Sequence, residues 1–440
     1  MRLVIKDCLV FPSPPQPGVK NDVVVDNDII SSLQQPNTAG GDVIFSIPDG
    51  IIIPGLVDIH SHLREPGHEY KEDIRTGTLT AVSGGITTIA AMPNTVPVMD
   101  CLERINQYKK IISEKAVCRV IPVSAMTEGQ QGKKLVDVED LVENGIFLFS
   151  DDGFPIPPNI LGEALKRTFA ANAYIIQHPE NPEKVGQGVV LQGKWSEYFK
   201  IKGIDPDSET EGIEQDLTVL KKQPGNLHFT HVSSAKSVKL ISDAKKEGIM
   251  VSADATPHHL ALTADRLKLA GSNAVMNPPL RGEQDRESIE RALKEGVVDF
   301  IASDHAPHHD QEKRRELANV PKGVIGFQTM LGVSLKILQK HMDFSQIISL
   351  LTTKPADRFR LDAGRLIPGS NADFAVIVEQ NWKVTSSRLS GKSRNTPFEG
   401  MELPYKIILT AVGGKVVYKS EDVEQYIKCS GKSIKKKNVL

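Results

Sequence analysis

The chain has few cysteines, little net charge and no long apolar run, and each of these shortages excludes a class of protein. Its 440 residues include 4 cysteines (Cys8, Cys101, Cys118 and Cys429), with no CxxC pair. A disulfide-stapled fold is therefore not expected, whereas reduced thiols in a cytoplasmic protein are. The formal net charge of -2 gives no reason to expect nucleic acid or an anionic membrane as a partner.

Membrane-spanning and targeting segments are missing as well. No run of about 18 apolar residues occurs, and the apolar stretch at the N-terminus is short and interrupted by prolines. We therefore expect neither a transmembrane helix nor a signal peptide. Residues 426–440 are rich in lysine, and we expect them to form a basic, solvated tail.

Strand-like apolar runs alternate with helix-length amphipathic segments through the middle of the chain. The runs lie at residues 51–60, 86–93, 117–125, 146–152, 173–180, 227–234, 249–257 and 297–306. Eight successive β-then-α units predict an α/β fold, a (β/α)₈ TIM barrel over residues 54–363. A doubly wound sheet is the alternative, but no GxGxxG follows the first run.

The two ends of the chain have a different texture, with short alternating β patterns and turn residues between them. Residues 1–53 and 364–425 are therefore predicted to form one small β-sandwich subdomain built from both termini. Two stretches within the barrel, 181–208 and 260–296, are longer than ordinary βα connections, and such loops usually shape a site.

Ionisable residues gather at the C-terminal ends of the predicted barrel strands, which is where barrel enzymes have their active sites. They are His60, His62, Asp151, Asp152, His178, His231, Asp304, His305 and His308. One strand-end histidine is more often structural than a ligand, and one aspartate is often only a helix N-cap. Four histidines and two aspartates from five strands have no such explanation, and they predict a divalent metal site.

Imidazole and carboxylate ligands without thiolate suit Zn²⁺, with other first-row divalent ions as alternatives. Six ligands exceed the needs of one tetrahedral zinc, so we expect two ions that share a bridging group. Such a pair would acidify a bound water and polarise a substrate carbonyl, as in amide or ester hydrolysis.

The motifs around these residues resemble those of the dihydroorotases, in the amidohydrolase superfamily, of the type with an aspartate between the metals. The similar segments are DIHSHLREPG (58–67), AMPNT (91–95), FSDDG (149–153), HFTHVSSAKSV (228–238), ATPHHLALT (255–263), NPPLR (277–281), ASDHAPHHDQEK (302–313) and NTPFEG (395–400). The resemblance covers residues from about 45 to 420 of the printed sequence.

The resemblance implies a role for each residue of the site. One metal would be held by His60, His62 and Asp304, the second by His178 and His231, and Asp152 rather than Asp151 would bridge them. The substrate carboxylate would be bound by Arg64, Asn94 and His308, since a guanidinium can hold a carboxylate through two parallel hydrogen bonds. Asn277 and main-chain groups around Gly323 would contact the amide edge of the ring.

The implied reaction is the reversible opening of dihydroorotate to N-carbamoyl-L-aspartate, a step of pyrimidine biosynthesis. Asp304 would be the catalytic residue that takes a proton from the nucleophile and passes it to the departing ring nitrogen. The resemblance also implies a homodimer and, as in some relatives, a contact with aspartate carbamoyltransferase.

Four features depart from the family pattern. Ser61 stands where an aliphatic residue is usual, QHPEN (177–181) replaces the more usual HCE, Lys322 stands where an aromatic residue is common, and Gln328 where glutamate is common. Lys322 and Gln328 belong to a substrate-side loop and therefore bear on affinity and substrate identity.

Two other functions are compatible with the pattern. Dihydropyrimidinases and allantoinases are related cyclic-amide hydrolases, but they bridge their metals with a carboxylated lysine, and residues 146–153 contain no lysine. A non-catalytic assembly partner of the same family would have lost metal ligands, and all six positions are filled here.

Overall fold

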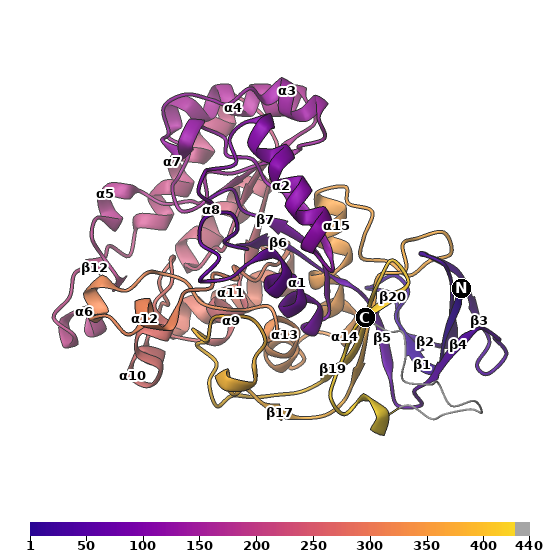
Figure 1. Cartoon of the computed structure of the whole chain (residues 1–440). Coiled ribbons are helices and arrows are strands. Elements are labelled where there is room, and N and C mark those ends of the chain that lie inside the picture. The colour runs from indigo at the N-terminus through magenta and orange to yellow at the C-terminus, as the bar shows by residue number, and fades with distance from the viewer. Residues whose placement is uncertain (427–440) are drawn as a thin grey trace.

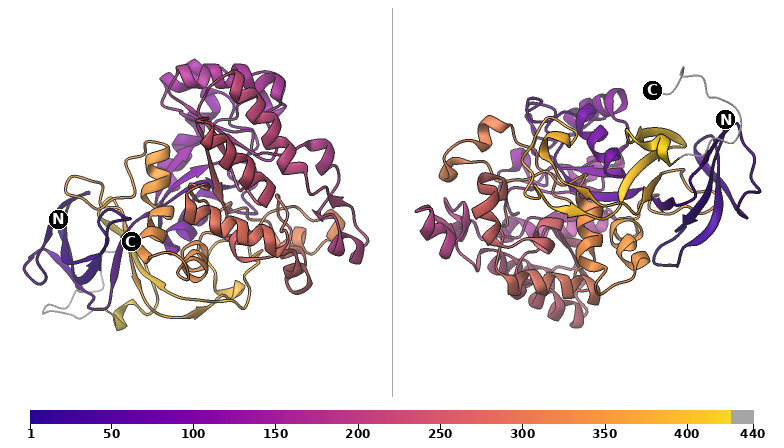
Figure 2. Two further views of the ribbon diagram at one scale, coloured as in Figure 1. Left: turned by 180° about the vertical axis from the view of Figure 1, so that it is seen from behind. Right: turned by 90° about the horizontal axis from the view of Figure 1, so that it is seen from below.

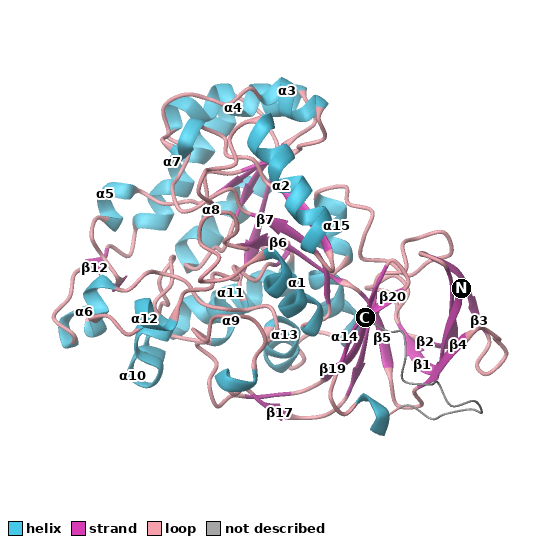
Figure 3. Ribbon diagram, in the orientation of Figure 1, coloured by secondary structure: helices cyan, strands magenta, loops and turns pink. Residues whose placement is uncertain are grey.

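The computed structural model describes residues 1–426, so the predicted basic tail lies outside the described residues apart from Tyr426. Strands fill the centre of the larger unit and helices surround them, with a second, strand-rich unit at one side (Figures 1 and 3). Within the described chain, no helix has the length and apolar character that a membrane crossing needs.

The larger unit is a barrel of parallel strands, as predicted. Its strands in chain order are β6 (Leu56–Ser61), β7 (Ile86–Ala91), β8 (Arg119–Pro122), β9 (Leu148–Phe149), β10 (Tyr174–Gln177), β13 (Leu227–Phe229), β14 (Val251–Ala255) and β15 (Phe300–Ile301). Three of them form the sheet β6-β7-β8 and five form the sheet β15-β14-β13-β10-β9. Parallel bridges between Ser124 and Phe149 and between Ser61 and His305 join the two sheets into a closed barrel.

A helix follows each barrel strand and packs on the outside of the barrel. These helices are α1 (Ile74–Ser83), α2 (Leu102–Lys115), α3 (Val138–Glu143), α4 (Pro158–Ala170), α7 (Ser208–Lys222), α8 (Ala235–Lys246), α11 (Glu283–Glu295) and α13 (Met330–Leu338). The last is followed by α14 (Phe344–Leu351) and α15 (Thr353–Arg358). Buried aliphatic and aromatic side chains of strands and helices form one continuous core, which fixes the strand ends relative to one another.

The long connections contain short elements of their own. After β10 come α5 (Pro182–Val185), β11 (Val190–Leu191), α6 (Lys194–Tyr198) and β12 (Gly203–Ile204), and after β14 come α9 (Pro257–Ala261) and α10 (Leu267–Ala270). A short helix, α12 (Asp310–Lys313), follows β15. The prediction of a long connection over 260–296 was wrong in its second half, because residues 283–295 are the barrel helix α11.

The second unit is a β subdomain made from both ends of the chain. Its strands are β1 (Arg2–Val10), β2 (Val19–Asp26), β3 (Ile29–Gln34), β4 (Val43–Ser46), β5 (Ile51–Pro54), β16 (Phe374–Val378), β19 (Lys406–Val412) and β20 (Lys415–Lys419). They join in one 8-stranded sheet of order β20-β19-β16-β5-β1-β2-β3, with β4 paired to β1. Figure 2 shows the N-terminal strands in indigo beside the C-terminal strands in yellow.

The first predicted barrel strand, 51–60, is divided between the two units. Residues 51–54 pair with β16 of the subdomain, whereas residues 56–61 pair with β7 of the barrel. Gly55 lies between them, and a Cβ there would come within 2.0 Å of the Thr87 side chain. One apolar run therefore serves both units, and the exact domain limits at 53/54 and 363/364 stay predictions.

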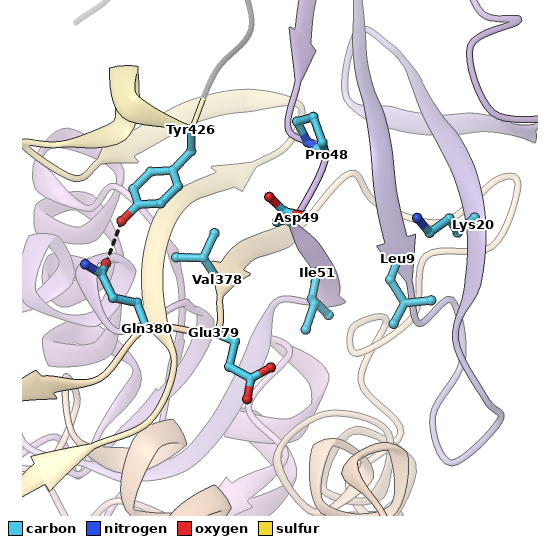
Figure 4. A pocket seen from close by; sticks show the side chains of 10 residues that line it. Leu9, Lys20, Pro48, Asp49, Ile51, Val378, Glu379, Gln380 and Tyr426 are labelled. Atoms are coloured by element: carbon cyan, nitrogen blue, oxygen red, sulfur yellow. Dashed lines mark hydrogen bonds between the residues drawn. The ribbon is translucent and has the colours of Figure 1, made fainter.

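A hollow of about 590 Å³ lies in the β subdomain, lined by Leu9, Ile51, Val378, Glu379 and other residues (Figure 4). Tyr426, the last described residue, borders it and donates a hydrogen bond to Gln380. Its lining has no histidine, so it does not offer the ligand set that the sequence predicts for the site.

Candidate active site

A cavity of about 390 Å³ opens at the C-terminal ends of the barrel strands. Its lining includes His62, Arg64, Asn94, Asp152, His178, His231, Asn277, Asp304, His308 and Gly323. His60, the remaining predicted site residue, is fully buried, and its Nε2 lies 3.2 Å from Asp152 Oδ1. The fold thus brings every predicted site residue to one place.

Asp152 lies among the four predicted histidine ligands. Its Oδ1 is 3.2 Å from His60 Nε2, 3.6 Å from His178 Nδ1 and 3.8 Å from His231 Nε2, and its Oδ2 is 3.4 Å from His62 Nε2. This central place is the one that a carboxylate bridging two ions requires.

Asp304 lies just past β15, the strand beside β6, and faces His60 and His62. Its Oδ1 lies 3.6 Å from His60 Nε2 and 3.4 Å from His62 Nε2. His60, His62 and Asp304 form one group whose ligand atoms lie within 4.8 Å of one another, and His60, Asp152 and His231 form a second.

Unpaired buried atoms support a cation at this place. His60 Nε2 and Asp152 Oδ1 have no hydrogen-bond partner within the described chain, although both are buried. Leaving such a group unsatisfied costs about 1–3 kcal/mol, and a divalent ion would remove that cost for both. Imidazole nitrogens and carboxylate oxygens are ordinary donors to such ions, so the residues present fit a metal.

Neighbouring side chains determine which nitrogen of each histidine is free to bind a metal. Thr230 donates its only hydroxyl proton to Asp254 (3.0 Å), so it must accept from His60 Nδ1 at 2.5 Å. His62 Nδ1 likewise donates to Asn94 Oδ1 at 2.9 Å. In both rings Nδ1 is therefore engaged in a hydrogen bond, and Nε2 is the nitrogen that faces the carboxylates of the cavity.

His178 is oriented in the opposite sense. Its Nε2 lies 2.9 Å from Glu180 Oε2, which leaves Nδ1 to face Asp152. Asn277 donates to the same Glu180 oxygen at 2.8 Å. Glu180 thus links a metal-facing histidine to a residue predicted to contact substrate.

Asp254, at the end of β14, organises the floor of the site. One oxygen accepts from Thr230 Oγ1 and from His228 Nε2, and the other accepts from the His231 main-chain N–H at 2.7 Å. His228 itself is fully buried and stacks on Phe300 in the core, so its role is structural.

The two aspartates of FSDDG have separate tasks. Asp151 Oδ1 accepts from the main-chain N–H groups of Met126 and Thr127, and its Oδ2 accepts from Thr127 Oγ1. Its carboxylate is therefore committed to the loop after β8. Asp152 is the one that reaches the histidines, which is the arrangement expected from the sequence.

Electrostatics keep the carboxylates ionised. Burial raises the pKa of Asp152, but His60, His178 and His231 outweigh burial and hold that pKa well below its usual value. The pKa of Asp304 is also lowered, because His62 and His60 outweigh its burial. At neutral pH both side chains are anions, so the site is suited to cations.

Three residues of the site have left-handed backbone, which non-glycine residues seldom adopt. Their φ angles are +64° at Arg64, +42° at His231 and +44° at Asp304. Each lies two or three residues past the end of a barrel strand, and each lines the cavity at the mouth of the barrel. Strain of this kind gathers at functional sites.

The residues predicted to bind substrate form the wall beside the metal ligands. Arg64 Nε donates to the Pro307 carbonyl at 3.1 Å, and its Nη2 lies 3.4 Å from His308 Nε2. His308 Nε2 also lies 2.9 Å from the Lys322 carbonyl. A Cβ on Gly323 would come within 3.0 Å of His308 Nε2, so only glycine allows this approach.

Comparison with known proteins shows the family of the chain. A family model described as "Dihydro-orotase-like" matches residues 49–237, and one described as "Amidohydrolase family" matches residues 209–417. The chain is 40% identical over 407 residues to the dihydroorotase of Bacillus cereus (strain AH820), which covers 92% of this chain and 95% of that protein. The chain belongs to the dihydroorotase family. The dihydroorotase of Bacillus thuringiensis (strain Al Hakam) gives the same identity and coverage.

The solved structures of similar fold are of hydantoinases and dihydropyrimidinases. The L-hydantoinase of Arthrobacter aurescens matches with a TM-score of 0.85 at 22% identity, covering 95% of this chain and 96% of that one. The dihydropyrimidinase of Brevibacillus agri matches with a TM-score of 0.85 at 21% identity and 95% coverage of both chains. At these identities the likeness shows that this dihydroorotase-family chain shares their fold.

Sequence reasoning missed three supporting residues, Glu180, Thr230 and Asp254. Glu180 lies two residues after His178, and Thr230 lies one residue before His231. Asp254 lies near the end of β14. A search for carboxylate and hydroxyl groups flanking each histidine would have found them, because metal-binding histidines usually donate their other N–H to such groups.

Proposed function

We propose that this protein catalyses the reversible opening of dihydroorotate to N-carbamoyl-L-aspartate. The observation that carries the proposal is the position of Arg64, whose guanidinium shares one cavity with the His60–His62–Asp304 group. A substrate that is a cyclic amide with a carboxylate needs both the guanidinium and the metal ligands, whereas an uncharged cyclic amide needs only the metal ligands.

We further propose that the cation is Zn²⁺ and that two ions bind. His60, His62 and Asp304 would hold one, His178 and His231 the other, and Asp152 both. When bound, the ions would lower the pKa of a water molecule and polarise the ring carbonyl.

The side chains of this protein then have separate tasks in the reaction. Arg64, Asn94 and His308 would orient the substrate by its carboxylate, and Asn277 would contact the amide edge. Asp304, held as an anion by His62 and His60, would accept a proton from the attacking water and deliver it to the departing ring nitrogen. In ring closure the same carboxyl group would begin protonated.

A substrate panel on purified, metal-quantified protein tests the proposal. Dihydroorotate, dihydrouracil and allantoin would be assayed side by side, and dihydroorotate should be strongly preferred. Preference for dihydrouracil would favour the dihydropyrimidinase alternative instead. Metal-free protein with no turnover of any of the three, even after addition of Zn²⁺, would favour a non-catalytic assembly role.

The pH dependence of the equilibrium tests the reaction type separately. Ring opening converts an amide into a carboxylate and releases one proton, so the ratio of open to closed compound should rise about tenfold per pH unit near neutrality. A ratio that does not change with pH would show that no carboxylate is formed.

A further inference from the structure

Asn395 lies in a segment that leaves the β subdomain and returns to the barrel mouth, between β17 (Trp382–Lys383) and β18 (Glu402–Leu403). Its side chain is 1% exposed. It does not line the cavity, so it does not contact the substrate directly.

The amide of Asn395 binds both loops that form the substrate side of the cavity. Its Nδ2 donates to the Ala306 carbonyl at 3.1 Å and to the Gly323 carbonyl at 3.0 Å. Its Oδ1 accepts from the His308 main-chain N–H at 3.2 Å. Its own main-chain carbonyl accepts from the Ile325 N–H at 3.1 Å.

These partners are the walls of the carboxylate-binding region. Ala306, His308 and Gly323 all line the cavity, and the Arg64 side chain is fixed to the same loop through the Pro307 carbonyl. A shift between the two loops would therefore move His308 and Arg64 relative to Gly323.

Few side chains could replace this amide. Two N–H donors and one acceptor are used at once, and asparagine supplies them on a short, stiff stem. Alanine would leave the carbonyls of Ala306 and Gly323 and the N–H of His308 without this buried partner, which favours rearrangement of the loops.

We propose that Asn395 is a positioning residue for substrate affinity, which holds the loops of His308 and Gly323 at the separation that the substrate's carboxylate and ring require. The proposal rests on the dihydroorotase function proposed above. It makes the C-terminal segment, and not the barrel alone, responsible for part of the specificity for a carboxylate-bearing ring.

The test compares Asn395→Ala with Thr396→Val in the full-length, metal-loaded protein. Thr396 is a matched control because it is equally buried, at 1% exposed, and among residues 1–426 its Oγ1 has one hydrogen-bond partner, the Phe398 N–H of the same segment. KM and kcat for dihydroorotate, metal content and melting temperature would be measured for both.

Asn395→Ala should raise KM about tenfold or more, since several hydrogen bonds are lost and one alone is worth up to about a factor of ten. Its kcat and metal content should stay within about threefold of wild type, and Thr396→Val should change neither constant by more than that. If Asn395→Ala does not fold, the same measurements on Asn395→Ser test the proposal, because serine keeps one donor and one acceptor.

A folded Asn395 variant with wild-type KM would overturn the proposal, as would equal losses of kcat and metal at constant KM. Assay of the wild-type protein distinguishes an error in the role of Asn395 from an error in the proposed function. If the wild type does not open dihydroorotate, the function is wrong; if it does and the Asn395 variants bind normally, only the role of Asn395 is wrong.

Discussion

Replacement of Arg64 by alanine separates substrate binding from metal binding. Arg64 lies two residues from the metal-facing His62, yet its guanidinium points along the cavity wall and contacts the loop of Pro307 and His308. Among the described residues, this side chain forms no hydrogen bond or ion pair with Asp152 or Asp304. Arg64→Ala should therefore leave metal content at the wild-type level.

The expected loss of affinity follows from the donors that remain free. Nε is used by the Pro307 carbonyl, so the terminal nitrogens are left to bind a carboxylate. Truncating one partner of a buried, hydrogen-bonded charge pair costs about 2–5 kcal/mol. Taking about 3 kcal/mol, KM for dihydroorotate should rise about 150-fold, since each 1.4 kcal/mol is a factor of ten.

The assay is steady-state kinetics on protein whose metal content has been measured by mass spectrometry. His60→Ala is the matched comparison, because it removes a metal-facing imidazole from the same strand end and should lose metal. If both variants lost metal to the same extent, the division of roles between His60 and Arg64 would be refuted.

Three further changes test other parts of the site and the fold. Glu180→Gln should weaken metal binding by about 10–100-fold, because the carboxylate that orients His178 is lost; chelator competition measures this, and unchanged affinity would remove Glu180 from the metal support. Lys322→Phe introduces the aromatic residue common in the family and removes a cation from the cavity, so it should raise KM for the dianion carbamoyl aspartate more than for the monoanion dihydroorotate; equal effects would contradict a direct electrostatic role. Burial raises the pKa of Asp216 to about 8, although Gln177 donates to it. The folded state thus favours the protonated form, and stability should fall as pH rises from about 4 to about 8. Asp216→Asn should therefore raise the melting temperature at pH 9 and have little effect at pH 4, and an equal effect at both would disprove the linkage.

The ligands could be predicted from sequence because a strand has a period of two and barrel strands end at one rim. His60 and His62 share a face for that reason, and Asp304 and His231 end strands of the same barrel. The choice of Asp152 over Asp151 came from the resemblance. Its physical reason is visible only in three dimensions, because the Asp151 carboxylate accepts hydrogen bonds from the N–H groups of Met126 and Thr127.

The sequence could not show which supporting residues meet. Thr230 and His60 are 170 positions apart, and Asn395 is 87 positions from His308. Nothing local in the chain links such pairs, so only the barrel closure and the return of the C-terminal segment reveal them. The division of the run 51–60 between two sheets was missed for a related reason, since apolar periodicity does not say which neighbour a strand pairs with.

The closure of the barrel has a consequence for how this chain folds while it is being synthesised. Asp58, on β6, accepts from both the main-chain N–H and the hydroxyl of Ser303, just past β15, and these residues are 245 positions apart. During translation, His60 and His62 leave the ribosome long before Asp304 exists, so the first strand must wait with one edge unpaired. The seam that completes the barrel is also the seam that completes the ligand set. A nascent or truncated chain that ends before β15 therefore has five of the six predicted metal ligands and an open strand edge, and binding of an ion that needs Asp304 would report that the ring of strands has closed.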